Sequence, residues 1–264
     1  CPCILLQLIA TGKPLSTAGM MIEDGTRTYT IAMERTVVPE NFSFRMTDEE
    51  YRVLEKIKNS IPVCYLADHA DFALGIVTGN NKKFLSAEKT QHSEMVLKGT
   101  DICKYHINPV KQYLRFEPEQ FQQVAPLEIY RAPEKLLYRF ISNQLVVAYD
   151  DRQMLSLNSC NIVIPKIEGM QIKYILAILN SSVSQFVYQK EFHSIKVLRA
   201  HMEHIPIPRV GKAIQNEIIA MTEPLICGMG KEAAETCQKR LDCRIMDLFR
   251  LSAEEQWIIR HALH

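Results

Sequence analysis

The sequence has no long apolar run and no excess of charge of one sign. No apolar stretch approaches the ~18 residues that a membrane-spanning helix requires, and no secretory signal peptide is recognisable, so we expect no membrane partner and a cytoplasmic location. Lys and Arg number 31 against 30 Asp and Glu, a formal net charge of +1, which does not suggest a nucleic-acid binder. With 47% hydrophobic and 23% charged residues, the composition excludes the disordered and low-complexity classes.

The eight cysteines do not have the spacing of a zinc site. No Cys-x-x-Cys pair occurs, although pairs of this kind are usual in structural zinc sites. Buried free thiols are therefore expected. The histidines gather only at His193, His201 and His204. Because no further ligand has a convincing spacing, we expect no metal ion there.

Motifs for chemistry on DNA are also missing. Methyl transfer to an exocyclic amine would need an Asn/Asp/Ser-Pro-Pro-aromatic loop, but Asn108-Pro109 is followed by Val110. A common metal-dependent nuclease would need a Glu-x-Lys, and the sequence has none. The neighbouring carboxylates Asp150 and Asp151 end a predicted strand, where successive side chains point to opposite faces, so we expect a structural role for them. We identify no catalytic residue and no bound cofactor for this chain.

The neutral total hides an uneven distribution of charge. Residues 75–115 carry a net charge of +4 and residues 186–215 a net charge of +3, whereas the segments before, between and after them are acidic, at −3, −1 and −2. Basic segments attract polyanions because each neutralised phosphate releases condensed counterions. The alternative is that these lysines cover solvated faces.

Hydrophobic spacing and turn residues predict a β-rich middle followed by a helical end. Strands are expected at 3–9, 28–34, 73–77, 135–141, 145–149, 154–157 and 161–164, with an extended segment at 205–208. The polar residues 142–144 between two of these strands, 135–141 and 145–149, predict a hairpin. Helices are expected at 47–60, 170–189, 213–221, 232–249 and 252–263. Capping boxes (Thr47 with Glu50, Ser252 with Glu255) begin two of these helices. The pattern predicts an α+β fold with mixed or antiparallel strands.

Residues 73–84 (ALGIVTGNNKKF) begin a series of recognisable blocks. The segment resembles the opening of the target-recognition domain of TaqI-type N6-adenine DNA methyltransferases and related type IIG restriction–modification enzymes. Further blocks follow in the family's order over about residues 65–220: Lys98–Ile102 (KGTDI) with Tyr105, Pro133–Leu137 (PEKLL) with Arg139, Ala148–Asp150 (AYD), Ile175–Ser182 (ILAILNSS), and Ile205–Pro208 (IPIP) with Gln215. The family's methylation motifs are absent, so no catalytic role carries over.

The resemblance implies a three-part organisation. Residues 1–62 would be the last strands of a methyltransferase domain and a connector helix, residues 63–210 the target-recognition domain, and residues 211–264 a helical segment. S-adenosylmethionine would bind the upstream methyltransferase domain of the parent polypeptide, to which a nuclease domain could also be fused. The implied partners are double-stranded DNA and that upstream domain, in a restriction–modification system.

The candidate DNA contacts combine the two basic segments with turn residues. Lysines supply phosphate contacts, whereas amide and guanidinium groups read base edges. Asn can bind adenine through two hydrogen bonds, and Arg can bind guanine in the same way. The residues expected to contact DNA are Thr78, Asn80, Asn81, Lys82, Lys83, Lys104, Arg115, Lys190, His193, Lys196 and Arg199.

Two other functions remain open from the sequence. The chain could be a nuclease with an unrecognised metal site at its three clustered histidines. It could also be a protein-interaction scaffold whose helical end forms a dimer seam, since residues 216–264 carry a net charge of −2.

Overall fold

The structure, a computed structural model, describes residues 17–23, 27–33, 35, 45–192 and 194–263. The predicted strand at 3–9 and His193 therefore lie outside the described residues. The chain divides into two compact units, Cys1–Tyr51 (unit 1) and Arg52–His264 (unit 2). None of the helices in the described part of the chain has the length and apolar character that crossing a bilayer requires.

Unit 1 contains an antiparallel hairpin, formed by β1 (Met20–Glu23) and β2 (Thr28–Ile31). The carboxylate of Asp48 accepts hydrogen bonds from the backbone amides of Ala32 and Met33, at 2.9 and 3.1 Å, and lies 2.7 Å from a guanidinium nitrogen of Arg35. Burial alone would raise the pKa of Asp48, but these hydrogen bonds lower it below its usual value. The first turn of the following helix thus holds the chain that leaves the hairpin.

That helix, α1 (Asp48–Asn59), begins as the sequence predicted. The backbone N–H of Thr47 donates to the Glu50 carboxylate at 2.9 Å, and the N–H of Glu50 donates to the Thr47 hydroxyl at 3.3 Å. This reciprocal pair is the expected capping box. The second expected box is also confirmed, at the start of α9 (Ala253–Ala262), between Ser252 and Glu255.

An antiparallel four-stranded sheet forms the centre of unit 2. Its order is β4 (Ala70–Ala73), β11 (Cys160–Pro165), β8 (Lys135–Arg139) and β9 (Val147–Asp150). The pairing of β8 with β9 confirms the predicted hairpin. The strand predicted at 73–77 is displaced, because β4 ends at Ala73 and the later residues form only isolated bridges.

A second, mixed sheet packs against this one through an apolar core. Its order is β10 (Leu155–Ser156), β6 (Glu94–Leu97), β7 (Tyr113–Leu114) and β5 (Leu85–Ser86), and only β10 pairs in parallel, with β6. The core between the sheets includes the buried side chains of Ile76, Val96, Leu114, Leu137 and Ile162. The short elements of this region are α2 (Asn81–Phe84), η1 (Gly99–Asp101), η2 (Pro118–Gln120) and α3 (Leu127–Tyr130).

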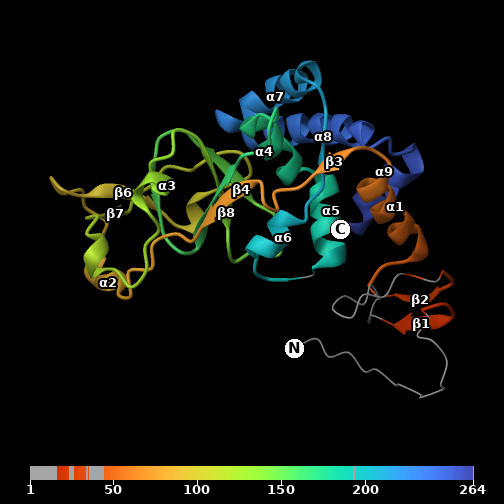
Figure 1. Cartoon of the computed structure of the whole chain (residues 1–264), viewed down its shortest axis with the longest axis horizontal. Helices are drawn as coiled ribbons and strands as arrows, with labels where there is room; N and C mark the ends of the chain where they lie inside the picture. The colour runs from red at the N-terminus through yellow and green to blue at the C-terminus, as the bar shows by residue number, and fades with distance from the viewer. Residues whose placement is uncertain (1–16, 24–26, 34, 36–44, 193, 264) are drawn as a thin grey trace. The chain divides into compact units, whose positions relative to one another are not determined.

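Most of the longer helices of unit 2 lie on one side of the unit, and most of its strands lie on the opposite side (Figure 1). The helices that follow β11 in the chain are α4 (Ile172–Asn180), α5 (Ser182–Glu191), α6 (Arg199–Glu203), α7 (Lys212–Ile226), α8 (Lys231–Leu248) and α9. Helix α4 packs against β9 and α7, and α5 packs against α8 and α9. The extended segment predicted at 205–208 contains β12 (Ile207–Pro208), which pairs with β3 (Val63–Cys64). Together, the sheets and helices confirm the predicted α+β class.

The single helix predicted at 170–189 is wrong, because the chain breaks at Ser181. Ser181 has an extended backbone (ψ 158°), and its hydroxyl oxygen accepts a hydrogen bond from the N–H of Ser184. The N–H of Ser182 donates to a carboxylate oxygen of Asp242 at 2.8 Å. The first amides of α5 thus bond to side chains rather than to carbonyls of α4.

Asn180, directly before this break, bonds to the edge of the central sheet. Its side-chain amide donates to the Val147 carbonyl at 2.8 Å, and its side-chain oxygen accepts from the Val147 N–H at 3.0 Å. Asn180→Leu should lower the free energy of unfolding by about 2–4 kcal/mol, because two buried backbone groups lose their partners. Urea unfolding measures this change, with the exposed Asn216→Ala as the control that should stay within about 0.5 kcal/mol. Equal effects of the two substitutions would contradict the assignment.

Candidate nucleic-acid interface

Residues 78–83 form a tight loop that continues into α2. The hydroxyl of Thr78, which is only 4% exposed, donates to the side-chain oxygen of Asn81 at 2.6 Å. Gly79 has a φ of +75°, a conformation that glycine adopts without strain. The side-chain oxygen of Asn80 accepts from the N–H of Lys83 at 3.2 Å and so caps the helix. Thr78 therefore positions the loop through its hydroxyl, and its contact with DNA stays a prediction.

The lysines of this loop are exposed above an aromatic cluster. Lys82 and Lys83 are both exposed, and the Lys83 ammonium lies 4.6 Å from the ring centroid of Phe84. That ring packs edge-on against Phe121 at 5.3 Å. The cation is thus held over a ring that is fixed by the core, which limits its conformational freedom.

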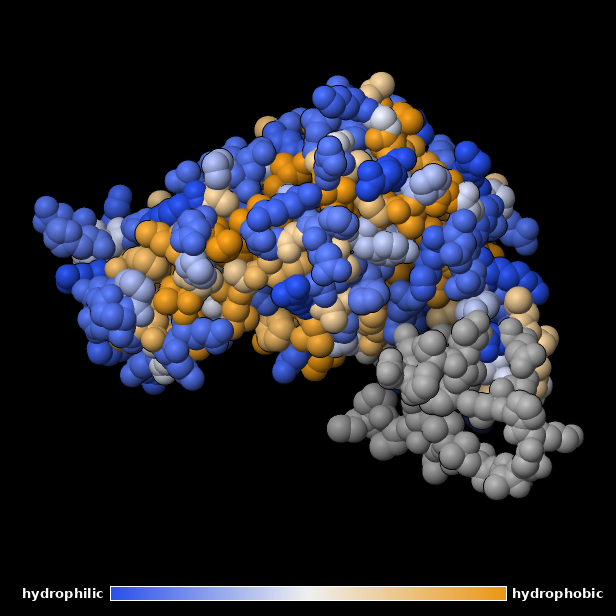
Figure 2. All heavy atoms as spheres, in the orientation of Figure 1, coloured by the Kyte–Doolittle hydropathy of each residue, from blue (hydrophilic) through white to orange (hydrophobic). Residues whose placement is uncertain are grey.

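Arg115 lies beside this helix. Leu114, the last residue of β7, pairs with Leu85, the residue that follows α2. Arg115 comes directly after Leu114 and therefore lies at the end of the helix. The Arg115 guanidinium is 65% exposed and lies 2.8 Å from the Glu117 carboxylate. Together these residues form the first basic patch: Asn80, Asn81, Lys82, Lys83 and Arg115. Figure 1 shows α2 and β7 at one end of unit 2, and in Figure 2 the tip at this end is largely hydrophilic.

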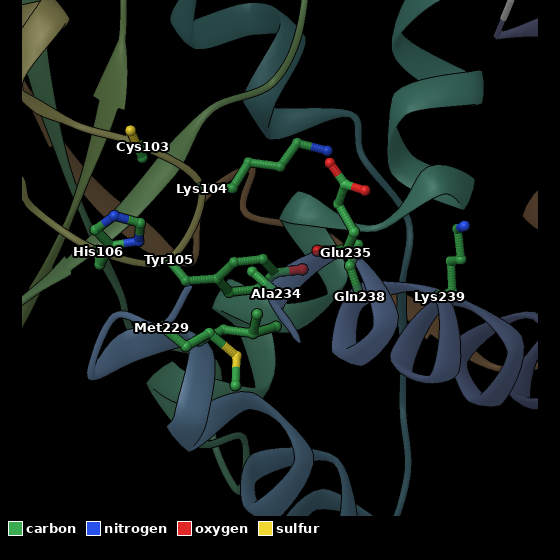
Figure 3. Close-up of a pocket in the computed structure, with 10 residues that line it drawn as sticks. Cys103, Lys104, Tyr105, His106, Met229, Ala234, Glu235, Gln238 and Lys239 are labelled. Atoms are coloured by element: carbon green, nitrogen blue, oxygen red, sulfur yellow. The ribbon is translucent and has the colours of Figure 1, made fainter. Parts of the chain in front are cut away.

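Lys104 does not lie in this patch. Its ammonium donates to the Asn180 carbonyl at 3.0 Å, and burial lowers its pKa, opposed by the nearby Asp242 carboxylate. The side chain lines a cavity of about 420 Å³ between the loop at 103–106 and helices α7 and α8, where it extends toward Glu235 (Figure 3). Lys104 therefore lies at the junction with the helices, outside the first basic patch, and its contact with DNA stays a prediction.

The second basic segment runs along the end of the central sheet. Lys196 forms a bridge with Ile141, and the N–H of Val197 donates to the Phe140 carbonyl at 2.8 Å. The Lys196 ammonium lies 5.9 Å from the ring centroid of Phe140. The segment is thus attached by its backbone to the residues that follow β8, and Lys196 is exposed there.

Arg199 begins α6 on the same segment. Its guanidinium lies 5.2 Å from the ring centroid of Phe72 and 2.7 Å from the Glu203 carboxylate, and the hydrogen bond to Glu203 raises the pKa of Arg199. We call Lys196 and Arg199 the second basic patch. Lys190 lies on α5, with its ammonium 5.8 Å from the ring centroid of Phe186. The structure therefore places seven of the predicted DNA contacts in two patches on different elements, whereas Thr78, Lys104 and Lys190 lie in neither patch.

The residues that carry the family resemblance are mostly inside the fold. The Arg139 guanidinium donates to the carbonyls of Gly99 and Ile102, at 2.8 and 2.6 Å, which ties β8 to the KGTDI block. The Lys135 ammonium lies 2.5 Å from the Asp150 carboxylate, and both side chains are fully buried. These contacts hold the domain together. The exposed residues Asn80 to Lys83 belong to the first block, whereas Arg115, Lys196 and Arg199 lie between blocks. Asp150 has the structural role expected from the sequence.

Two of the three clustered histidines, His201 and His204, make contacts within the fold. The His201 ring stacks on Phe192 with centroids 4.5 Å apart, and a ring nitrogen of His204 lies 2.6 Å from the Ala200 carbonyl. Among the residues that the structure describes, no group of three His, Cys, Asp or Glu side chains is arranged to hold a metal ion.

Comparison with solved structures gives distant likenesses. One is a chain of a type I restriction–modification system, with 14% identity, a TM-score of 0.42, and 82% of this chain aligned to 52% of that one. Another is the type IIL restriction–modification enzyme MmeI in complex with DNA, with 11% identity, a TM-score of 0.49, and coverage of 76% and 35%. A third is the HsdS subunit from Thermoanaerobacter tengcongensis, with 13% identity, a TM-score of 0.40, and coverage of 82% and 50%. The chain thus spans about half or less of each.

Comparison with protein-family models gives a direct match. Residues 94–207 match the TaqI-like C-terminal specificity domain, whereas comparison with curated proteins gives no match. The matched segment contains η1, both strands of the β8–β9 hairpin, and helices α4 to α6. It also ends at β12, in the IPIP block that the sequence had singled out. The resemblance inferred from the ordered blocks is confirmed, because residues 94–207 of this chain match the TaqI-like C-terminal specificity domain.

Proposed function

We propose that this chain recognises a specific DNA sequence for a restriction–modification enzyme. The observation that carries the proposal is the specificity-domain match at residues 94–207. The surface of the described residues supports it, because unit 2 presents exposed cations on both basic patches and exposed side-chain amides on the first.

In this proposal, the first basic patch lies against the DNA backbone and an adjacent groove. Lys82 and Lys83 contact phosphates and thereby position the domain without reading sequence. Asn80 and Asn81 already use their side-chain oxygens inside the loop, so their amide groups act mainly as donors. Donors of this kind fit phosphate oxygens and the acceptors of purine edges, such as N7. This refines the two-bond reading of adenine by Asn that was expected from the sequence.

The parent protein would extend beyond this chain. We propose an upstream methyltransferase domain of the same polypeptide that binds S-adenosylmethionine and methylates adenine N6 after rotating the base out of the duplex. Residues 63–210 would then form the recognition domain, and residues 211–264 a helical segment that supports it. Duplex DNA and the upstream domain are the proposed partners, in the cytoplasm. No residue of this chain is assigned a catalytic step.

The double substitution Lys82→Ala/Lys83→Ala tests this function. We expect it to weaken binding to all duplex sequences alike and to reduce the slope of log K against log salt by about 2, since each phosphate contact contributes about 0.9. Fluorescence anisotropy with labelled duplex DNA across a series of salt concentrations measures both quantities.

The matched control removes the same charge from a surface outside both patches. Lys231→Ala/Lys239→Ala changes two exposed lysines of α8 and should leave the slope almost unchanged. If the two double variants behave identically, the first basic patch is not part of the interface. If the unaltered chain shows no salt-dependent binding at all, DNA recognition itself is refuted.

A further inference from the structure

Three aliphatic side chains are exposed beside the second basic patch. Ile141 is 63% exposed, Ile195 73% and Leu198 43%. They lie on two backbone segments that are joined directly, because the N–H of Ser142 donates to the Ile195 carbonyl at 3.0 Å and Ile141 pairs with Lys196. We call Ile141, Ile195 and Leu198 the aliphatic patch. Single exposed hydrophobic residues are ordinary, but adjacent ones mark an interaction surface.

The backbone around the aliphatic patch is well anchored. Val197, between the exposed residues, is buried and its N–H donates to Phe140. Tyr188 fixes the start of the same segment, since its hydroxyl donates to the Ser194 carbonyl at 2.9 Å. The exposed aliphatic groups therefore project from a supported backbone, and binding through them would cost little ordering entropy.

The charges next to the aliphatic patch favour an anionic partner. Lys196 and Arg199 lie on the same segment, each over an aromatic ring. The carboxylates of the adjacent helices are already engaged, Glu191 with Lys58 at 2.6 Å and Glu203 with Arg199. Residues 186–215 as a whole carry a net charge of +3. Figure 2 shows hydrophobic side chains reaching the surface among hydrophilic ones in this part of the molecule, near α6 of Figure 1.

We propose that the aliphatic patch lies in a groove of duplex DNA and contacts base pairs and sugars, while Lys196 and Arg199 contact the flanking phosphates. This inference rests on the proposed function and adds a second contact surface to it. Aliphatic side chains bind DNA through thymine methyl groups or by wedging against a base step. Neither contact releases counterions, so this part of the affinity does not depend on salt.

The difference in salt dependence gives a sharp test. The probe is a duplex obtained by selection with the unaltered 264-residue chain from a pool with a randomised centre. Ile141→Ser/Ile195→Ser should weaken binding to this duplex by about tenfold or more at every salt concentration, with the slope of log K against log salt unchanged. Lys196→Ala should instead reduce that slope by about 1. Leu127→Ser, at another exposed aliphatic residue (46% exposed), is the matched control and should bind as the unaltered chain does.

The outcomes separate this inference from the proposed function. If Lys82→Ala/Lys83→Ala weakens binding but Ile141→Ser/Ile195→Ser does not, the aliphatic patch is not a DNA contact and DNA recognition stands. If the patch variant instead changes the sedimentation coefficient or the binding to anionic vesicles, with unchanged DNA affinity, the patch faces protein or lipid and the inference is refuted. Urea midpoints equal to that of the unaltered chain ensure that a loss of binding is not a loss of folding.

Discussion

Lys135→Met should lower the free energy of unfolding by about 3–5 kcal/mol, since it leaves the buried carboxylate of Asp150 without its cation. Both side chains have no exposed surface, and the ammonium lies 2.5 Å from the carboxylate. The ammonium also donates to the Tyr130 carbonyl at 2.6 Å, a bond that Met cannot replace. Met has a similar length and an apolar side chain, so the main loss is electrostatic rather than steric.

The matched control is an ion pair at the surface of the same unit. Lys166 lies 2.6 Å from Asp71, but their side chains are 60% and 40% exposed. Lys166→Met should therefore change the free energy of unfolding by only about 0–1 kcal/mol. Urea unfolding followed by circular dichroism compares the two variants. A cost for Lys135→Met as small as that for Lys166→Met would show that Asp150 is rehydrated or protonated at little cost.

The buried pair also explains why the family blocks could be recognised before the fold was known. The PEKLL block contains Lys135 and the AYD block contains Asp150, so two of the blocks are the two halves of one interior contact. Arg139 likewise links its block to KGTDI. The resemblance therefore predicted the scaffold well. Asn80 and Asn81 also lie in one of its blocks, whereas Arg115, Lys196 and Arg199 lie in exposed segments outside the blocks.

Local signals in the sequence predicted local structure. The capping boxes at Thr47 and Ser252 and the hairpin of β8 with β9 depend on residues close in sequence, and all three are confirmed. The break at Ser181 could not be predicted in this way. Hydrophobic spacing continues across it, and one partner that stabilises the new helix start is Asp242, sixty residues later. Hydrophobic periodicity cannot predict a helix boundary that depends on a side chain distant in sequence.

The candidate site was predictable in its charge but not in its exposure. Each basic segment of the sequence contains the residues of one basic patch, because charged residues in short connecting segments are usually exposed. Thr78 and Lys104 have the expected chemistry, but their polar atoms already have partners within the protein, a local one for Thr78 and a distant one for Lys104. The aliphatic patch was missed for the opposite reason, since Ile195 in a sequence is normally interpreted as a core residue. Its position next to Lys196, within a basic segment, was the signal available in the sequence.

Gly75→Ala should destabilise unit 2 by at least about 3 kcal/mol or prevent folding, because it forces a clash between backbone segments in a close-packed interior. A Cβ atom at this position would lie 2.1 Å from the carbonyl oxygen of Leu157 and 2.8 Å from that of Cys160. Moving the two backbone segments apart would relieve the clash but would break hydrogen bonds between them. The N–H of Ile76 donates to the Ser156 carbonyl at 2.7 Å, and the N–H of Gly75 donates to the side-chain oxygen of Asn161.

Gly230→Ala is the control for this prediction. No heavy atom lies within 4 Å of the position that its Cβ would take, and its φ of −58° suits any residue. As the N-cap of α8 it should cost only about 1 kcal/mol or less. Thermal unfolding of both variants, together with DNA anisotropy, gives a second readout. Because Gly75 lies three residues before the loop at 78–83, a folded Gly75→Ala chain with displaced backbone should also lose binding. A Gly75→Ala chain with unchanged stability would mean that the two segments do not approach so closely.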